Sequence, residues 1–337
     1  MIASEVNPIY TVWLVSSIGK YNVSSVLNSV DMNESKKQIA RCATVSIMNV
    51  MVDGTWLSDR IKVRDRIFIY ANDGNGRKEV FRGFVWNRNY NSSLLDREIT
   101  LKCYDNLIYL QESEAFEFFA SGKSTQDIMS TICSDWGIEL EYKYESITHS
   151  KLALRGTLSD IMTTDILDPV KDRTGKQYVV LSEKDTLVVT GVGKNSTVHK
   201  IEAGKNAISV VSKCTMDGVV TKVVILGRAD RQDRRPVEAS LSQNTAEYGT
   251  LQKIITRDKD TTIEAAKDEG NNILKEKSTP KWEYEVTAID IPWLRKGDKI
   301  YVNAGDLKAR HLIVTDLSRS IDNKGKKIIL DCIDAET

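Results

Sequence analysis

Two stretches of the chain, Val63-Arg-Asp-Arg-Ile-Phe-Ile69 and Lys296-Gly-Asp-Lys-Ile-Tyr-Val302, share one pattern. In each, a turn with an Asp and a basic residue is followed by alternating apolar positions, which is typical of a half-buried β-strand. Asp65 and Asp298 lie 233 positions apart. The clearest difference is Arg64, where the second copy has Gly297. The pattern indicates that one β structure occurs twice.

Two further pairs of segments follow in the same order. Val80-Phe-Arg-Gly-Phe-Val-Trp86 corresponds to His311-Leu-Ile-Val-Thr315, and Glu98-Ile-Thr-Leu-Lys-Cys-Tyr-Asp105 corresponds to Lys327-Ile-Ile-Leu-Asp-Cys-Ile-Asp334. Unrelated antiparallel meanders also share turn chemistry, but a nearly constant offset favours duplication. Each copy is a series of strands and hairpins that suits a small antiparallel barrel or split sheet.

Between the copies the pattern becomes mixed. Ser124-Thr-Gln-Asp127 has the form of a capping box, and a second helix is predicted from about Thr157 until Pro169 ends or kinks it. We therefore predict a mainly β fold with an α+β insertion: two related small antiparallel β-barrels plus a middle α+β domain. The predicted domains are 1–112, the first barrel; 113–198, the middle domain; and 199–337, the second barrel, with one helix near 262–277.

The composition argues against several classes of protein. The 47 basic and 47 acidic residues cancel, which argues against a dedicated binder of nucleic acid or anionic membranes. The five cysteines are far apart and form no metal-binding pair, so we expect buried free thiols in a reducing compartment. The sequence shows neither a secretory signal pattern nor an apolar run of membrane-spanning length.

No motif marks a catalytic, cofactor-binding or metal site, so we predict none. Gly122-Lys-Ser124 lacks the upstream glycine of a phosphate-binding loop, since Glu117 stands there. His149, His199 and His311 follow no metal-ligand or triad spacing. The Asn72–Gly76 series fits a hairpin turn better than a calcium loop. A two-carboxylate glycosidase site stays open, because nothing marks any particular pair.

Two surface features allow a binding role. A charge-dense loop carries four arginines interleaved with Asp230 and Asp233, which favours a solvated loop or subunit contact over nucleic-acid binding. These arginines are Arg228, Arg231, Arg234 and Arg235. The aromatic side chains of Trp86, Tyr90 and Trp293 have the character of exposed residues in a carbohydrate-binding module.

The ordered set of segments resembles the baseplate hub proteins of contractile tails, and is similar to PBSX-type prophage tail proteins and the late control protein D family. Four segments carry the resemblance and span nearly the whole chain. They are Asp65-Arg-Ile-Phe-Ile69 with Phe81-Arg-Gly83, Ser124-Thr-Gln-Asp-Ile128, Tyr248-Gly-Thr-Leu-Gln252 and Leu294-Arg-Lys-Gly-Asp-Lys-Ile-Tyr-Val302. Arg64 departs from the family pattern, which favours glycine before the Asp.

The resemblance implies a non-enzymatic structural hub whose barrels are tube-like. Three copies would form a pseudo-sixfold ring that joins a six-fold tail tube above to a three-fold spike below, among other baseplate subunits. It implies synthesis in the bacterial cytoplasm without a signal peptide, no membrane insertion, and an end location in a virion or tail-like particle of a phage, bacteriocin or secretion device. DNA could pass through the lumen without specific binding. The alternatives are a peptidoglycan-degrading tail hydrolase and a carbohydrate-binding module.

Overall fold

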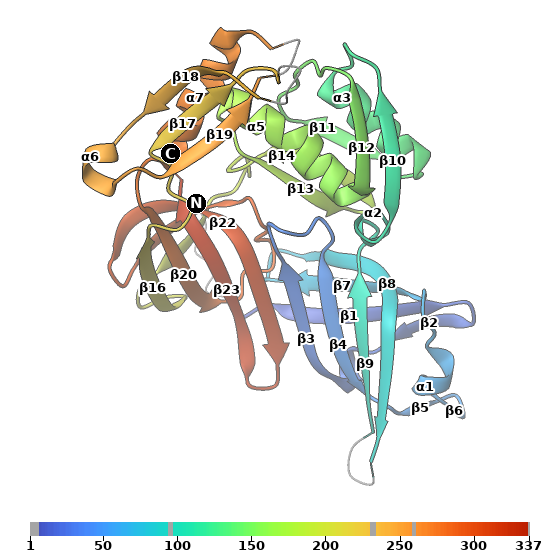
Figure 1. Ribbon diagram of the computed structural model, residues 1–337. Helices are drawn as coiled ribbons and strands as arrows, with labels where there is room; N and C mark the ends of the chain where they lie inside the picture. Colours follow the sequence, from blue (N-terminus) through green and yellow to red (C-terminus); the bar gives the residue numbers. More distant parts are fainter. Residues whose placement is uncertain (1–6, 94–96, 230–233, 258–260, 336–337) are drawn as a thin grey trace.

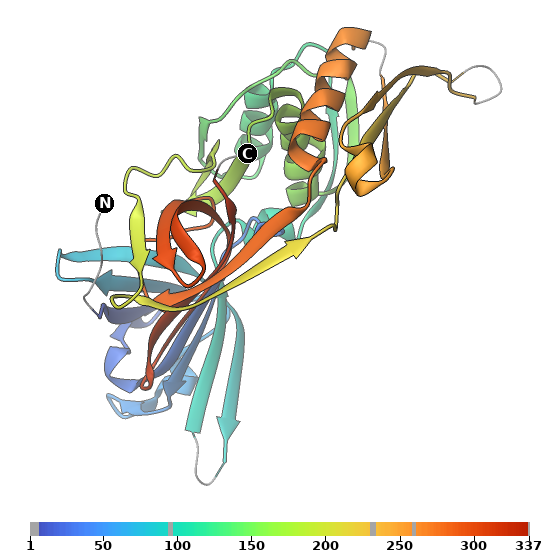
Figure 2. The ribbon, with the colours of Figure 1, turned by 90° about the vertical axis from the view of Figure 1, so that its left-hand side faces the viewer.

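The computed structural model describes residues 7–93, 97–229, 234–257 and 261–335. It has a lower layer of β-strands and an upper layer that contains the long helices (Figures 1 and 2). The lower layer contains a 13-stranded sheet with the order β16-β20-β23-β22-β3-β4-β9-β8-β7-β1-β2, with β21 beside β22 and β15 beside β21. Among the described strands this path is open, so the two small β-barrels that we expected are not closed, whereas the mainly β, antiparallel class is confirmed.

The first half of the sheet, here called the first module, is formed by the chain up to Tyr104. Apolar residues alternate along its strands and fill a core around Val12, Val45 and Ile69. Its elements are β1 (Ile9–Ser16), β2 (Gly19–Asn22), a 3₁₀ turn (Ser24–Val26), β3 (Leu27–Glu34), β4 (Cys42–Met48), β5 (Met51–Val52), β6 (Thr55–Trp56), α1 (Leu57–Arg60), β7 (Arg66–Asn72), β8 (Arg77–Ser92) and β9 (Arg97–Tyr104).

The second half of the sheet, here called the second module, has a separate core around Val286, Ile300 and Leu330. Its strands come from two stretches of the chain that are separated by an excursion into the upper layer. They are β15 (His199–Glu202), β16 (Ala207–Thr215), β20 (Lys281–Ile289), β21 (Lys299–Ala304), β22 (Leu307–Asp322) and β23 (Gly325–Asp334).

The duplication predicted from the Asp65 and Asp298 turns extends to the backbone. In the first module, Asp65 Oδ2 accepts from Lys62 N (2.7 Å) and Arg64 N donates to Val85 O. In the second, Asp298 Oδ2 accepts from Arg295 N (2.9 Å) and Gly297 N donates to Val314 O. Arg64 and Gly297 both have positive φ, 73° and 85°.

The upper layer holds the middle segment of the chain. Its core gathers around Ile128, Ile161 and Val189, and includes Ile39 and Leu107 from outside the predicted 113–198 domain. The elements are α2 (Ile108–Gln111), β10 (Glu114–Phe119), α3 (Thr125–Asp135), β11 (Leu140–Lys143), β12 (Leu152–Thr157), α4 (Leu158–Asp160), a π-helix (Ile161–Leu167), α5 (Asp168–Thr174), β13 (Tyr178–Glu183) and β14 (Thr186–Gly191).

Two helix predictions have different outcomes. Ser124 is the N-cap of α3 with both capping-box hydrogen bonds, as expected. The prediction that Pro169 ends or kinks the second helix is wrong as to the end, because the helical path continues to Thr174. The reason is the π-helical segment, in which Asp168 N donates to Thr163 O, so that Pro169 falls in the first turn of α5, where its missing N–H is tolerated.

The excursion between β16 and β20 also belongs to the upper layer. It contains β17 (Lys222–Leu226), β18 (Val237–Ser242), α6 (Thr245–Tyr248), β19 (Gln252–Thr256) and α7 (Ile263–Lys277). The Asn272 side chain donates to the carbonyls of Asp172 and Arg173 in α5, at 3.3 and 3.1 Å. Residues within the predicted span 199–337 therefore pack against the middle segment; the three-domain division stays a prediction.

Candidate assembly interface

The two modules join through one pair of strands. Residues Leu317–Asp322 of β22 pair antiparallel with Ser29–Glu34 of β3, with Arg319 opposite Met32 and Ile321 opposite Val30. We call this contact the joint. Since strand pairing runs without a break from one module to the other, the joint shows how two copies of the repeated β structure fit together.

A fully buried ion pair lies at the joint. Arg319 Nε is 2.6 Å from Asp290 Oδ1, and both side chains have no exposed surface. Arg319 Nη2 also donates to the carbonyls of Ile291 (2.9 Å) and Leu294 (3.3 Å), and Tyr10 OH donates to Asp290. Burial alone would lower the pKa of Arg319, but Asp290 raises it, so the guanidinium stays charged.

A second buried cluster surrounds Glu34 at the end of β3. Glu34 Oε1 lies 2.9 Å from Arg41 Nε and 2.6 Å from Arg295 Nε. Burial would raise the pKa of Glu34, but Arg295, Arg41 and Lys296 together lower it to about 2. Lys296 donates to the Ser35 and Gln38 carbonyls, so residues of the second module hold the β3–β4 connection in place.

These buried charges were missed in the sequence, although a signal was present. Leu317, Arg319 and Ile321 alternate on the buried face of β22, so an arginine stands in an apolar row. A charged residue at such a position must be paired, since an isolated buried charge is very costly. Its partner, Asp290, could not be identified from spacing because it comes from another segment.

Each module also presents a strand edge. Beyond the bulge at Val85/Asn87, residues Asn87–Ser92 of β8 pair with β9 on one side only and are all exposed. The β8–β9 hairpin extends away from the upper layer (Figure 1). At the far end of the sheet, β16 pairs with β20 alone. Among the described strands, no other strand pairs with either of these edges.

The histidines considered as catalytic candidates lie apart. His149 Nε2 is 2.9 Å from Thr125 Oγ1 inside the upper layer. His311 packs edge-on against Tyr301 of β21, and His199 is buried at the start of β15. Within the described part of the chain, no three or more His, Cys, Asp or Glu residues group as a metal site.

The remaining sequence candidates also do not converge. Gly122 and Lys123 directly precede Ser124, the N-cap of α3, as the helix-cap interpretation predicted. Of the charge-dense loop, Asp230, Arg231 and Asp233 lie outside the described residues, and Arg235 Nη1 donates to the Gly227 carbonyl (3.4 Å).

The prediction that Trp86, Tyr90 and Trp293 are all exposed is wrong for the two tryptophans. Trp86 packs against Tyr104 and Tyr109, and Trp293 Nε1 donates to Asp73 (2.8 Å), so both are half-buried; Tyr90 alone is exposed, on β8.

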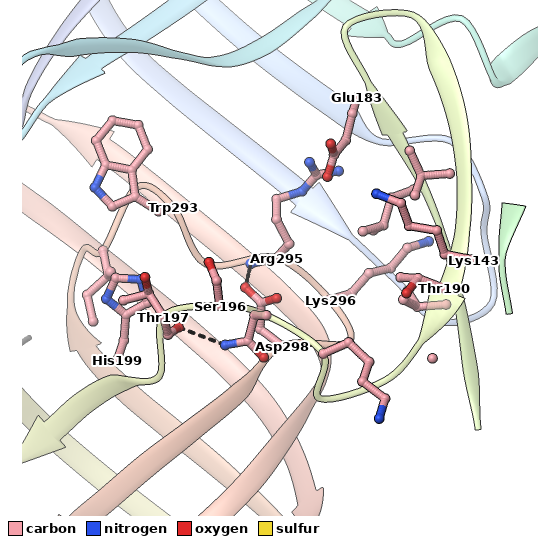
Figure 3. A pocket seen from close by; sticks show the side chains of 18 of the residues that line it. Lys143, Glu183, Thr190, Ser196, Thr197, His199, Trp293, Arg295, Lys296 and Asp298 are labelled. Carbon is pink, nitrogen blue, oxygen red and sulfur yellow. Dashed lines mark hydrogen bonds between the residues drawn. The ribbon is translucent and has the colours of Figure 1, made fainter. Parts of the chain in front are cut away.

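A pocket lies where the two modules and the middle segment meet (Figure 3). Its charged lining includes Lys143, Glu183, Arg295, Lys296 and Asp298. Arg295 and Lys296 are already engaged by Glu34 and by backbone carbonyls. Burial raises the pKa of Asp298 to about 7, in spite of the hydrogen bond from Arg295 N. Arg295 and Lys296 of this pocket therefore support the junction between the two modules.

No helix of the described residues has the length and apolar character needed to cross a membrane.

Comparison with solved structures defines the class of fold. A tail protein from Neisseria meningitidis MC58 matches with a TM-score of 0.72 and 14% identity, covering 97% of each chain. The 43 kDa tail protein of prophage MuSo2 from Shewanella oneidensis matches with a TM-score of 0.67 and 14% identity, covering 96% of this chain and 98% of that one. An E. coli type VI secretion component, c3393, described as similar to the T4 tail proteins gp27 and gp5, matches with 0.57 and 10% identity, covering 92% and 74%.

The fold is thus that of phage tail and baseplate proteins, as the resemblance found in the sequence predicted. The chain belongs to the YQBQ-like family, which it matches over residues 17–332. No curated protein matches the sequence.

Proposed function

We propose that this chain is a structural hub of a phage-type contractile tail baseplate. Three copies would form a ring of six similar β modules, which joins a six-fold tail tube on one side to a three-fold spike on the other. The observation that carries the proposal is the duplicated module with its built-in joint, because two equivalent modules per chain let a three-fold ring present near six-fold symmetry.

The likeness of fold to tail proteins, which extends over nearly the full length of each chain, supports this role. The buried charges found in the structure stabilise the joint and the junction between segments, which suits a scaffold. Under this proposal the partners are the tube and spike proteins and other baseplate subunits, and the particle is a virion or tail-like device.

Sedimentation equilibrium of the purified chain, alone and mixed with the tube and spike proteins of the same particle, tests the proposal. The expected result is a species of three chains of 37.9 kDa, with or without the neighbours. A chain that stays monomeric in every mixture contradicts it. Peptidoglycan zymography tests the alternative that the chain is a hydrolase. Cleared zones that disappear after substitution of a single carboxylate would favour the hydrolase over the hub.

A further inference from the structure

The free edge of β8 has a counterpart in the joint. Along β22, one edge is covered by β23; the other is covered by β21 up to Ile313 and by β3 from Leu317 onward. Along β8, one edge is covered by β9 and the other by β7 up to Phe84. In the described chain nothing pairs with the continuation of that second edge.

The residues of β8 and β22 correspond one to one. Both long strands have a register shift at the same point, at Val85/Asn87 in β8 and at Val314/Asp316 in β22. Val85 pairs with Cys103, and Val314 pairs with Cys332, so the offset is 229 on both strands of each hairpin. The free segment Arg88–Ser92 therefore occupies the place of Leu317–Ile321, the segment of β22 that pairs with β3.

In the second module, β16 occupies the place of β3. Met32 pairs with Ala43, which pairs with Cys103; Ser212 pairs with Tyr284, which pairs with Cys332. Both strands have a register shift at the same point, at Leu27/Ser29 and Ala207/Ser209. The offset between β3 and β16 is thus 180. The chain therefore contains both strand edges that a second joint would need: the end of β8 and the outer edge of β16. In the described structure neither of these edges pairs with another strand.

We propose that the end of β8 in one copy pairs antiparallel with β16 of the next copy, in the register of the joint. Applying the two offsets to the pair Arg319–Met32 places Tyr90 opposite Ser212, Arg88 opposite Cys214, and Asn91 opposite Val211. The partner is a second copy of this chain, because its β16 is the strand that corresponds to β3. The contact is head-to-tail, which builds rings when the rotation closes; the inference rests on the hub proposed above.

The chemistry of the two edges fits a contact made between chains. Tyr90 stands in the place of Arg319, and Cys214 in the place of Glu34, so neutral side chains replace the buried charges that the two paired strands of the joint carry themselves. Arg88, in the place of Leu317, is exposed in the single chain. Neutral groups avoid the desolvation penalty of burying ions when two chains associate. On β16, the apolar side chains of Ile208 and Val211 are 59% and 55% exposed. Such residues on an unpaired edge strand are typical of strands that add to another sheet.

Disulfide trapping tests the register. In the full-length Arg88→Cys variant, the introduced thiol would face the native Cys214 of the neighbour, within the separation that a disulfide spans. Mild oxidation should give a ladder on non-reducing gels that ends at three chains, because each copy supplies both thiols and the ring closes. The ladder should disappear in Arg88→Cys/Cys214→Ser. Asn89→Cys is the matched control, since its position is one residue out of register, and it should cross-link much less.

A second cysteine pair is needed because replacing Arg88, which donates to the Ser58 carbonyl, could itself change the end of β8. Asn91→Cys/Val211→Cys in a Cys214→Ser background probes the opposite face of the same ladder and should give the same three-chain limit. Oligomers that sediment as three chains but cross-link through neither pair would overturn this contact and leave the hub standing. A monomer under all conditions would overturn both. Stronger cross-linking of Asn89→Cys than of Arg88→Cys would reject the register.

Discussion

At the scale of single residues, Arg319 and Tyr90 show how the two copies of one module have diverged. They occupy equivalent positions on β22 and β8, but Arg319 is buried against Asp290, whereas Tyr90 is exposed on a free edge. The first arrangement gives a permanent contact within the chain. The second leaves a tyrosine, with no buried charge, on the edge that we propose contacts the next chain. The difference follows from the cost of a buried charge, which is acceptable only when its partner is always present.

Removing Arg319 should destabilise the fold strongly. Arg319→Met leaves the Asp290 carboxylate buried without its cation, at a cost of about 3–5 kcal/mol in the free energy of unfolding. Arg319→Met/Asp290→Asn should cost less than the sum of the two single changes by more than about 1 kcal/mol. Urea unfolding monitored by tryptophan fluorescence measures both effects.

The control is Arg310→Met, which breaks a partly exposed ion pair with Asp334 (3.2 Å) and should cost less than about 1 kcal/mol. Additive costs for Arg319 and Asp290 would show that the buried pair does not act as a unit.

Stability should depend on the ionisation of Asp298. Burial raises its pKa from 3.8 to about 7, so the folded state holds this proton more tightly than the unfolded state. The resulting stabilisation is complete below about pH 4 and is lost as pH rises to about 7. Asp298→Asn keeps an acceptor for Arg295 N without ionising, so relative to wild type it should gain up to about 4 kcal/mol between pH 4 and pH 8.

Melting temperatures of wild type and variant across this pH range provide the measurement. A constant difference between the two curves would contradict the assignment. Asp65→Asn makes the same change in the equivalent turn of the first module and also keeps an acceptor for the turn hydrogen bond, so it separates the effect of the amide substitution itself from the effect of removing the Asp298 carboxylate.

At the scale of elements, the turn before each central strand shows how one backbone shape accepts two residue types. Gly297 has φ +85°, and a Cβ there would come within 2.9 Å of Val179 Cβ. Arg64 has φ +73° and is exposed. The closely packed turn therefore requires glycine, whereas the open turn tolerates an arginine at some conformational cost.

Substitutions at the two equivalent turn positions should change stability in opposite directions. Gly297→Ala should lower the free energy of unfolding by about 2 kcal/mol or more, from the left-handed backbone and the clash with Val179. Arg64→Gly should leave stability unchanged or raise it by up to about 1 kcal/mol, since relief of the left-handed strain of about 1–2 kcal/mol exceeds the entropic cost of glycine. Thermal unfolding of both variants decides; a loss of equal size at both positions would refute the argument.

The sequence predicted elements with strong local signals and missed those defined by distant partners. The Asp65 and Asp298 turns and the capping box at Ser124 follow from short-range rules. The equivalence of β3 and β16 was not recognisable, because their side chains differ and a long excursion separates β16 from β20. The pairing of β3 with β22 joins residues almost 300 positions apart, which no local pattern specifies.

At the scale of the whole molecule, the chain contains one complete joint and the two halves of another. In place of closed barrels the described strands form one open sheet, which suits the proposed assembly, because a closed barrel has no edges to pair. The upper layer, with α5 and α7 in contact, lies on one side of the sheet (Figure 2). It leaves the β8–β9 hairpin and β16 available to neighbouring copies.

The alternation of the two modules around a ring is the central claim, and end-on electron microscopy of the purified assembly tests it most directly. We predict a ring of six β lobes with three-fold symmetry, in which first and second modules alternate and β8 of each copy lies beside β16 of the next. Particles with one or two copies, or a ring in which first and second modules do not alternate, would contradict it.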